Sequence, residues 1–198
     1  FNDCAQFTGQ GLQNWDTGSV ENMTAMFQDC SVFTGQGLQD WDTGKVSNMQ
    51  GLFQDCIMLN QDLSWNTQSV KNMYYMFNGC TQFNKHLSWN THSVTNMEYM
   101  FLNCSNFTGQ GLQNWDISSV TLANNMLDNT NISIDTFTEI LVKWGSQSSI
   151  QTNVTLGAKD LEYYSIQPGV LDLSNNHGWN IVGADVSYIV PFSKNIAH

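Results

Sequence analysis

The apolar residues of this chain recur at nearly fixed intervals. Successive Trp are separated by intervals of 26, 24, 24 and 26 in the numbering, and columns of Phe, Cys and Val keep step with them. Self-similarity at a period of roughly 20–50 residues is typical of repeat architectures. The pattern therefore predicts five tandem units of roughly 24–26 residues each over positions 1–126. The two aromatic columns are Trp15, Trp41, Trp65, Trp89 and Trp115, and Phe1, Phe27, Phe53, Phe77 and Phe101.

Each unit contains two apolar groups, which predict two short elements. In the first unit Leu12, Trp15 and Val20 lie in an extended stretch that Asp16–Gly18 interrupts as a turn signal. A second group follows with the spacing i, i+3, i+4 and i+7 of a short helical face. Because stacked units can bury a face that one unit cannot, we expect a leucine-rich-repeat-like solenoid with a short β-strand and a short helical turn in each coil. The second group consists of Met23, Met26, Phe27 and Cys30.

The period ends after residue 126, and other patterns follow it. Ser133 or Asp135 can cap a helix whose apolar face ends before Gly145. Pro168 can open a second helix, and Trp179–Val182 is typical of a strand. We therefore expect an α+β C-terminal cap over 127–184 and an extended tail over 185–198.

The repeat resembles a known surface-protein unit. The stretch Phe83–Phe101, FNKHLSWNTHSVTNMEYMF, is similar to the repeat F-N-x-D-L-S-x-W-D-T-S-x-V-T-N-M-x-x-M-F of the BspA-like (bacterial surface antigen) leucine-rich-repeat family. The resemblance covers 1–126 and continues into Phe137–Gly145, Val154–Gly157 and Gly178–Ile181. It implies a secreted or cell-surface protein linked to adhesion and protein binding, and it implies no enzyme activity.

Composition narrows the classes of partner. Charged residues make up 12%, and 17 carboxylates against six Lys give a net charge of −11. Such a chain is poorly suited to neutralise phosphates, which argues against nucleic acid and anionic membranes as partners. No apolar run approaches the length that spans a bilayer, so no membrane insertion is expected here. The Asn-, Gln-, Ser- and Thr-rich surface suits an extracellular location. A chain that starts at Phe1 is expected to be processed or trimmed.

Short motifs predict no catalytic, metal or cofactor site. Asp16-Thr17-Gly18 and Asp42-Thr43-Gly44 spell the aspartic-protease signature, but Asn66 and Asn90 occupy the Asp position in the next units. This substitution favours turn chemistry over a carboxylate dyad. An odd number of Cys in one apolar column favours free thiols, with one or two bridges between neighbouring units as the alternative. The column is Cys4, Cys30, Cys56, Cys80 and Cys104.

Three polar columns have a structural and a functional interpretation. The Thr column favours turn chemistry, with ordering of ice-like water as the alternative. The Asp column favours a solvated face, with a weak Ca²⁺ site as the alternative. The Asn column predicts buried amides that bond between units, so the Asn22 sequon is not expected to carry a glycan. The columns are Thr17, Thr43, Thr67 and Thr91; Asp3, Asp29 and Asp55; and Asn22, Asn48, Asn72 and Asn96.

Surface residues supply the remaining site candidates. Asn106, Asn131 and Asn153 lie in sequons at loop or cap positions and are glycosylation candidates. Phe1 and Cys4 enter the repeat in mid-unit, so either further repeats precede them in the full protein or another chain covers the first unit. An apolar tail could cover the equivalent face of another copy, head to tail. The tail candidates are Val186, Tyr188, Ile189, Val190 and Phe192.

These observations favour a non-enzymatic, extracellular structural or adhesive repeat protein that belongs to a larger assembly or filament. The alternative is a surface module whose exposed Tyr, Asn and Gln recognise a glycan or a protein ligand. The expected partners are proteins, including copies of the chain itself, and a glycan in the alternative. Mutation of single exposed columns distinguishes the two functions. A recognition module should lose ligand binding when one local hot spot is mutated, whereas a structural element depends on its ends.

Overall fold

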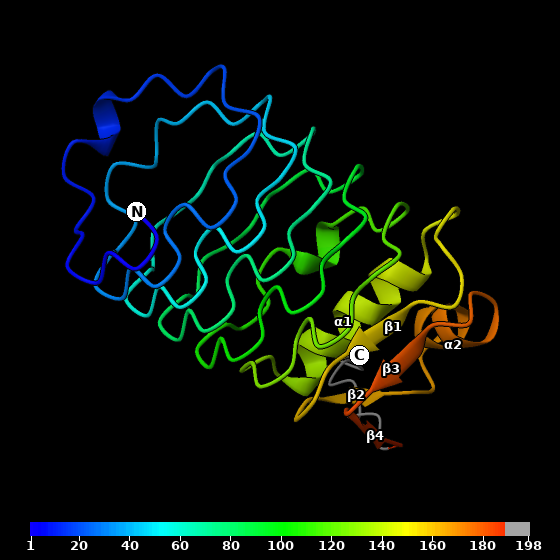
Figure 1. Ribbon diagram of the computed structural model, residues 1–198. Helices are drawn as coiled ribbons and strands as arrows, with labels where there is room; N and C mark the ends of the chain where they lie inside the picture. The colour runs from blue at the N-terminus through cyan, green and yellow to red at the C-terminus, as the bar shows by residue number, and fades with distance from the viewer. Residues whose placement is uncertain (189–198) are drawn as a thin grey trace, which may run out of the picture.

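The repeat units lie side by side in sequence order, in a computed structural model that describes residues 1–188 (Figure 1). Isolated parallel β-bridges join equivalent residues of successive units. The chain starts at one end of this stack, and the helices and strands gather at the other (Figure 1). The bridges link Asn22 to Asn48, Asn48 to Asn72, Asn72 to Asn96, and Asn96 to Leu122.

Regular secondary structure is concentrated beyond residue 132. Up to that point the chain contains only the short 3₁₀ helices η1 and η2. Two small sheets follow, in which β1 pairs parallel with β3 and β2 pairs parallel with β4. The elements are η1 (Leu12–Asn14), η2 (Leu112–Asn114), α1 (Ile134–Gly145), β1 (Thr155–Gly157), β2 (Glu162–Tyr164), α2 (Pro168–Asn175), β3 (Asn180–Val182) and β4 (Asp185–Ser187).

The predicted fold class is wrong. A leucine-rich-repeat-like solenoid with a β-strand and a helical turn in every coil would place regular elements throughout 1–126. Within residues 1–188 the structure instead has two α-helices and two separate two-stranded parallel sheets, all in the C-terminal part. The repeat units consist of turns and isolated bridges. Where an extended stretch was expected, the first unit forms η1.

The backbone hydrogen bonds explain why the helical spacing forms no helix. Met49 donates its N–H to the carbonyl of Asn72, and Phe53 donates to Met76, both at 2.9 Å and both in the next unit. Between them Leu52 donates to Met49, only three residues back. An α-helix needs every N–H to bond four residues back. Because alternate N–H groups leave the unit instead, the segment becomes a series of turns tied to its neighbour.

Left-handed residues accompany this alternation. One repeat position has positive φ in Ala25, Gly51, Tyr75, Tyr99 and Asn125, with values of 54–59°. A second such position is occupied by Asp, Gly or Asn, the residues that adopt this conformation at least cost. The Asp column therefore reflects backbone conformation. Its members are Asp3, Asp29, Asp55, Gly79, Asn103 and Asn129.

The predicted columns of the core are confirmed. Neighbouring Trp rings have centroids 6.0–6.5 Å apart and planes within 9° of each other. Each Trp from the second unit on donates its indole N–H to a Leu carbonyl of the preceding unit, at 2.8–3.0 Å. The Phe rings of one column lie 5.5–5.7 Å apart. Aromatic stacking and buried donors therefore lock one unit onto the next.

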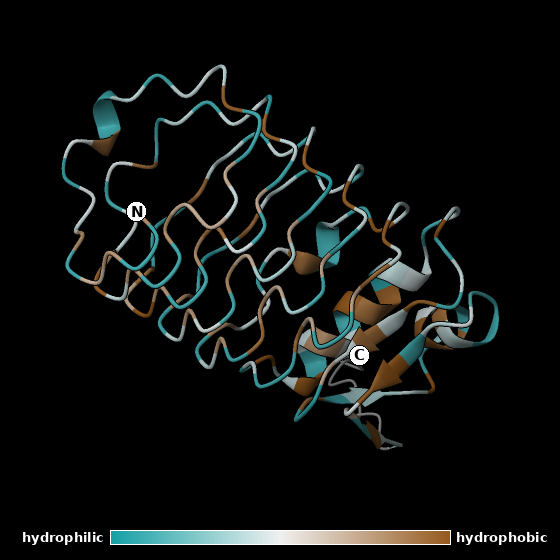
Figure 2. Ribbon diagram, viewed as in Figure 1, coloured by the Kyte–Doolittle hydropathy of each residue, from teal (hydrophilic) through white to brown (hydrophobic). Residues whose placement is uncertain are grey.

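The C-terminal part continues the stack. Trp144 of α1 donates its indole N–H to the carbonyl of Leu112 at 2.8 Å, where the Trp of a sixth unit would lie. Ala123 forms a parallel bridge to Leu156 of β1, and β1 pairs in turn with β3. Brown, hydrophobic ribbon fills much of α1, β1 and β3 in Figure 2. Two further layers thus cover the last repeat unit.

The local predictions for the C-terminal part hold better than the fold class. The helix expected after Ser133 is α1, and the Ser133 hydroxyl accepts from the N–H of Thr136. The helix expected at Pro168 is α2, and the predicted strand at 179–182 contains β3. The expected tail from 185 differs, because β4 pairs with β2 from Asp185 onward.

Trp65→Ala should destabilise the protein by about 3–5 kcal/mol, as expected for a large buried aromatic. The change removes ring stacking with both Trp41 and Trp89 and leaves the Leu38 carbonyl without its indole donor. Urea unfolding measures the loss. Gln68→Ala, an exposed side chain of the same unit, is the control and should stay within about 0.5 kcal/mol of the unchanged protein. A loss below about 1 kcal/mol for Trp65→Ala would contradict the stacked core.

Candidate functional site

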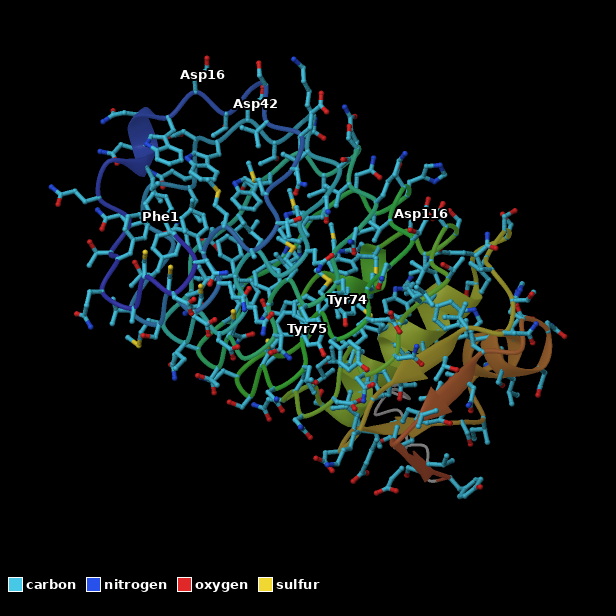
Figure 3. All side chains as sticks on the ribbon, in the orientation of Figure 1. Phe1, Asp16, Asp42, Tyr74, Tyr75 and Asp116 are labelled. Carbon is cyan, nitrogen blue, oxygen red and sulfur yellow. The ribbon has the colours of Figure 1, made fainter. Side chains whose placement is uncertain are left out.

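The outer face of the first unit exposes two aromatic rings. Trp15 is 45% exposed and Phe1 40%, whereas Trp41, Trp65 and Trp89 are each 5% exposed. The Phe1 ring stacks on Phe7 and on Phe27, with centroids 4.1 and 5.7 Å apart. Figure 3 shows Phe1 in the outermost loop of the stack.

Hydrogen-bonding groups on this face also differ from those in later units. The indole N–H of Trp15 donates to no residue among 1–188, unlike the indoles of the other units. The carbonyls of Asn48 and Leu52 accept from Met23 and Phe27 of the preceding unit. Their equivalents in the first unit, Asn22 and Met26, accept from no backbone N–H of the described chain. We define the first-unit face as Phe1, Cys4 and Trp15 with the carbonyls of Asn22 and Met26.

The cysteines form the predicted column of free thiols. All five are unpaired with one another; Cys4 is exposed and the other four are buried. Each buried thiol donates to the Phe carbonyl of the preceding column position at 2.9–3.1 Å. Burial raises the pKa of Cys30, Cys56, Cys80 and Cys104, which disfavours the reactive thiolate.

The two tail candidates that the structure describes, Val186 and Tyr188, lie away from the first-unit face. Val186 lies in β4, opposite Tyr163 of β2, and is 40% exposed. Tyr188 is 76% exposed. Ile189, Val190 and Phe192 lie outside the described residues. Figure 1 places β4 at the far end of the stack from the N-terminus.

The Asn column is not the buried amide column that the sequence predicts. Asn22 is exposed, and its Oδ1 accepts from the backbone N–H of Thr24 at 2.9 Å and from the Thr24 hydroxyl at 2.6 Å. The same local bond to residue i+2 recurs at Asn48, Asn72 and Asn96. These amides shape a turn, so Asn22 joins the accessible sequons. The predicted candidates Asn106, Asn131 and Asn153 are also exposed.

The Thr column is buried, which excludes the ice-binding alternative for its hydroxyls. Thr43 and Thr67 donate to the carbonyls of Asn66 and Asn90 in the next unit, both at 2.9 Å. Thr91 makes the equivalent bond at 2.8 Å. The column therefore contributes to stacking. In the first unit the buried Thr17 hydroxyl has no hydrogen-bond partner among residues 1–188.

The Asp-Thr-Gly motifs form turns, as interpreted from the sequence. Asp16 and Asp42 accept from the N–H of Gly18 and Gly44, at 3.2 and 2.9 Å. Figure 3 shows both carboxylates along one edge of the stack, with Asp116 farther along it. Within residues 1–188, no group of three or more His, Cys, Asp or Glu could hold a metal ion.

A His–Asp–Ser cluster on the same edge was missed by the sequence analysis. His92 Nδ1 lies 3.0 Å from Asp116 Oδ2 and 3.4 Å from the Ser118 hydroxyl, beside a hollow of about 470 Å³. The pKa of the Asp116 carboxyl is lowered from its ordinary value. Burial alone would raise this pKa, but the hydrogen bonds from Ser118 and His92 outweigh the effect of burial. Serine catalysis needs the hydroxyl and the carboxylate on opposite ring nitrogens. Both contact Nδ1 here, so the cluster does not activate Ser118.

A tyrosine cluster was missed as well. Tyr75 and Tyr99 occupy the same position of successive units, and their rings stack with centroids 4.6 Å apart. Tyr74 meets both rings edge-on. Tyr75 and Tyr99 are separated by one repeat period, so the register alone could have predicted the stack.

Comparison with known proteins places the repeats in a family. The family model described as "Mycoplasma protein of unknown function, DUF285" matches residues 1–108 and 64–160. The chain belongs to this family. Neither a curated protein nor a solved structure matches the chain. The described part of the chain contains no helix long and apolar enough to cross a membrane.

One thiol should react in the native protein and four more on unfolding. Cys4 is exposed, whereas burial keeps the other four as unreactive thiols. Titration with a chromogenic disulfide reagent, before and after addition of guanidinium chloride, counts both sets. Cys4→Ser is the control and should remove only the fast-reacting thiol. Rapid reaction of several thiols in the folded Cys4→Ser protein would contradict the buried column.

Proposed function

We propose that this chain is a non-enzymatic structural and adhesive repeat protein that acts outside the cell or at its surface, as part of a larger assembly. The observation that carries the proposal is the first-unit face. It combines two exposed aromatic rings, at Phe1 and Trp15, with an indole donor and backbone carbonyls that the later units use for stacking. Unpaired backbone groups beside exposed rings favour pairing with further protein.

The chemistry of the proposed partner follows from what one unit presents to the next. A preceding unit supplies a Leu carbonyl to the indole, a Phe carbonyl to the thiol, and alternate N–H groups to the carbonyls. Protein with the same repeat satisfies all three kinds of group at once. Further repeats ahead of Phe1 in a longer chain are such a partner. A second copy joined head to tail is another, and its heterologous contact extends into a filament when its rotation does not close.

An extracellular location is supported by three features. The resemblance of Phe83–Phe101 to BspA-like repeats implies surface or secreted proteins. The polar surface consists largely of neutral amides and hydroxyls, with few Lys. Four of the five thiols are buried, so an oxidising environment has little access to them.

The double variant Phe1→Ser, Trp15→Ser should abolish self-association. The native chain is expected to associate with rising concentration, because two exposed rings and an unused indole donor lie on one face. Light scattering coupled to gel filtration measures the mass, and circular dichroism checks that the variant folds. Ile57→Ser, which removes a side chain that is also 45% exposed, is the control. A native chain that stays monomeric at millimolar concentration would contradict the assembly proposal.

Secretion from a glycosylating cell should attach N-linked glycans at Asn106, Asn131 or Asn153, because all three sequon amides are exposed. The exposed Asn22 is accessible too, in contrast to the sequence-based expectation. Intact-mass analysis before and after enzymatic deglycosylation measures occupancy, with Asn→Gln at each position as the control. An unchanged mass on deglycosylation would show that these sequons are closed to the modifying enzyme.

A further inference from the structure

The tyrosine cluster lies apart from the Trp, Phe and Cys columns of the core and joins only two of the units, through the Tyr75–Tyr99 stack. Its rings lie on the surface, half-buried, away from the edge that carries Asp16 and Asp42 (Figure 3). Tyr75 and Tyr99 are parallel to within 1°, and Tyr74 stands at 88° to each of them. One face of the Tyr75 ring is thus covered by Tyr99.

The backbone at this cluster is strained. Tyr75 and Tyr99 have φ of 58° and 59°, a region that bulky side chains rarely adopt. The same column holds Ala25, Gly51 and Asn125 in other units, which are smaller or better suited to it. Strain that the fold does not need is a signal of function. Neither tyrosine is required for the conformation, since Gly would adopt it more easily.

The change from small residues to Tyr along this column creates a groove. Ala25 and Gly51 leave a hollow of about 290 Å³ in the first two units, and Tyr74 and Tyr75 form its wall. A Cβ added to Gly51 would meet only the Oε1 of Gln54, at 3.6 Å. Tyr75 lines this hollow while Tyr99 covers one face of its ring, so the other face is the one that a ligand can stack on.

The polar groups of the groove are neutral and oriented. Thr24, Gln28, Gln50 and Gln54 line it together with the tyrosines, and no charged side chain does. Gln50 Oε1 accepts from the Asn72 amide, and Gln54 Nε2 donates to Asp55, both at 3.3 Å. These bonds leave Gln50 Nε2 as a donor and Gln54 Oε1 as an acceptor, since neither atom bonds another residue within 1–188.

We propose that this groove binds a neutral oligosaccharide, with the apolar face of one sugar ring on Tyr75 and sugar hydroxyls on Gln50 and Gln54. An aromatic ring beside fixed amide donors and acceptors matches a ligand that has an apolar face and a hydroxylated rim. The net charge of −11 and the absence of Lys from the lining disfavour sulfated or carboxylated glycans. The inference goes beyond the assembly role and does not depend on it.

Calorimetric titration of the full chain tests the groove. The probes are the neutral hexasaccharides of glucose, mannose and xylose, and a heparin hexasaccharide as the anionic comparison. At least one neutral probe should bind, and Tyr75→Gly should weaken it by about tenfold or more, a loss of one stacking contact. Circular dichroism should show that Tyr75→Gly keeps the native fold, because Gly adopts the positive φ of this position readily.

Two further variants complete the test. Gly51→Asn should also abolish binding, because it fills the hollow with a residue that this column already carries at Asn125. Asn125→Gly, a truncation at the same repeat position outside the groove, should leave binding unchanged. None of these variants should change the self-association of the chain, which keeps this test separate from that of the first-unit face.

The proposal is overturned if no neutral probe binds, if heparin binds as tightly, or if Tyr75→Gly and Gly51→Asn retain the native affinity. The native chain could instead bind an unfolded protein such as casein and none of the sugars. If Tyr75→Gly then lost that binding, the groove would be a peptide site and the glycan proposal would be overturned.

Discussion

Directional hydrogen bonding between successive units is the constraint on which the rest of the structure depends. Alternate backbone N–H groups and the Thr hydroxyls donate forward, as from Phe53 to Met76 and from Thr43 to Asn66. The indole and thiol donors point backward, as from Trp65 to Leu38. Each unit therefore needs a neighbour on both sides, and a buried donor left alone is costly. The C-terminal part meets that need with Trp144 and β1, whereas the first-unit face finds no such neighbour within residues 1–188.

The sequence predicted which residues form the core better than how the backbone connects them. The period fixes the Trp, Phe and Cys columns, and capping signals locate α1 and α2. The helix expected at Met23–Cys30 fails because a spacing of three and four residues also fits turns whose alternate N–H groups bond the next unit. The decisive signal was Asp29, Asp55 and Gly79 at one position, which marks positive φ rather than a solvated face or a Ca²⁺ site.

Candidate sites were harder to predict, because the repeat spacing shows which residues align in a column but not whether that column is buried or exposed. The Thr column was assigned to turns and proves to donate between units. The Asn column was assigned to the interior and proves to shape turns, in which Asn22 is exposed and the later members are half-buried. The tyrosines depart from the small residues of their column and create the groove beside Gly51. Function in such a chain is expected where a unit differs from the others, since the shared positions are used for stacking.

Through-hydrogen-bond scalar couplings measured by NMR report directly on whether alternate N–H groups bond across units. We expect a coupling between the amide nitrogen of Phe53 and the carbonyl carbon of Met76, and another between Met49 and Asn72. We expect none between Phe53 and Met49, the pair that an α-helix would join. A coupling between Phe53 and Met49, without the coupling to Met76, would contradict the account.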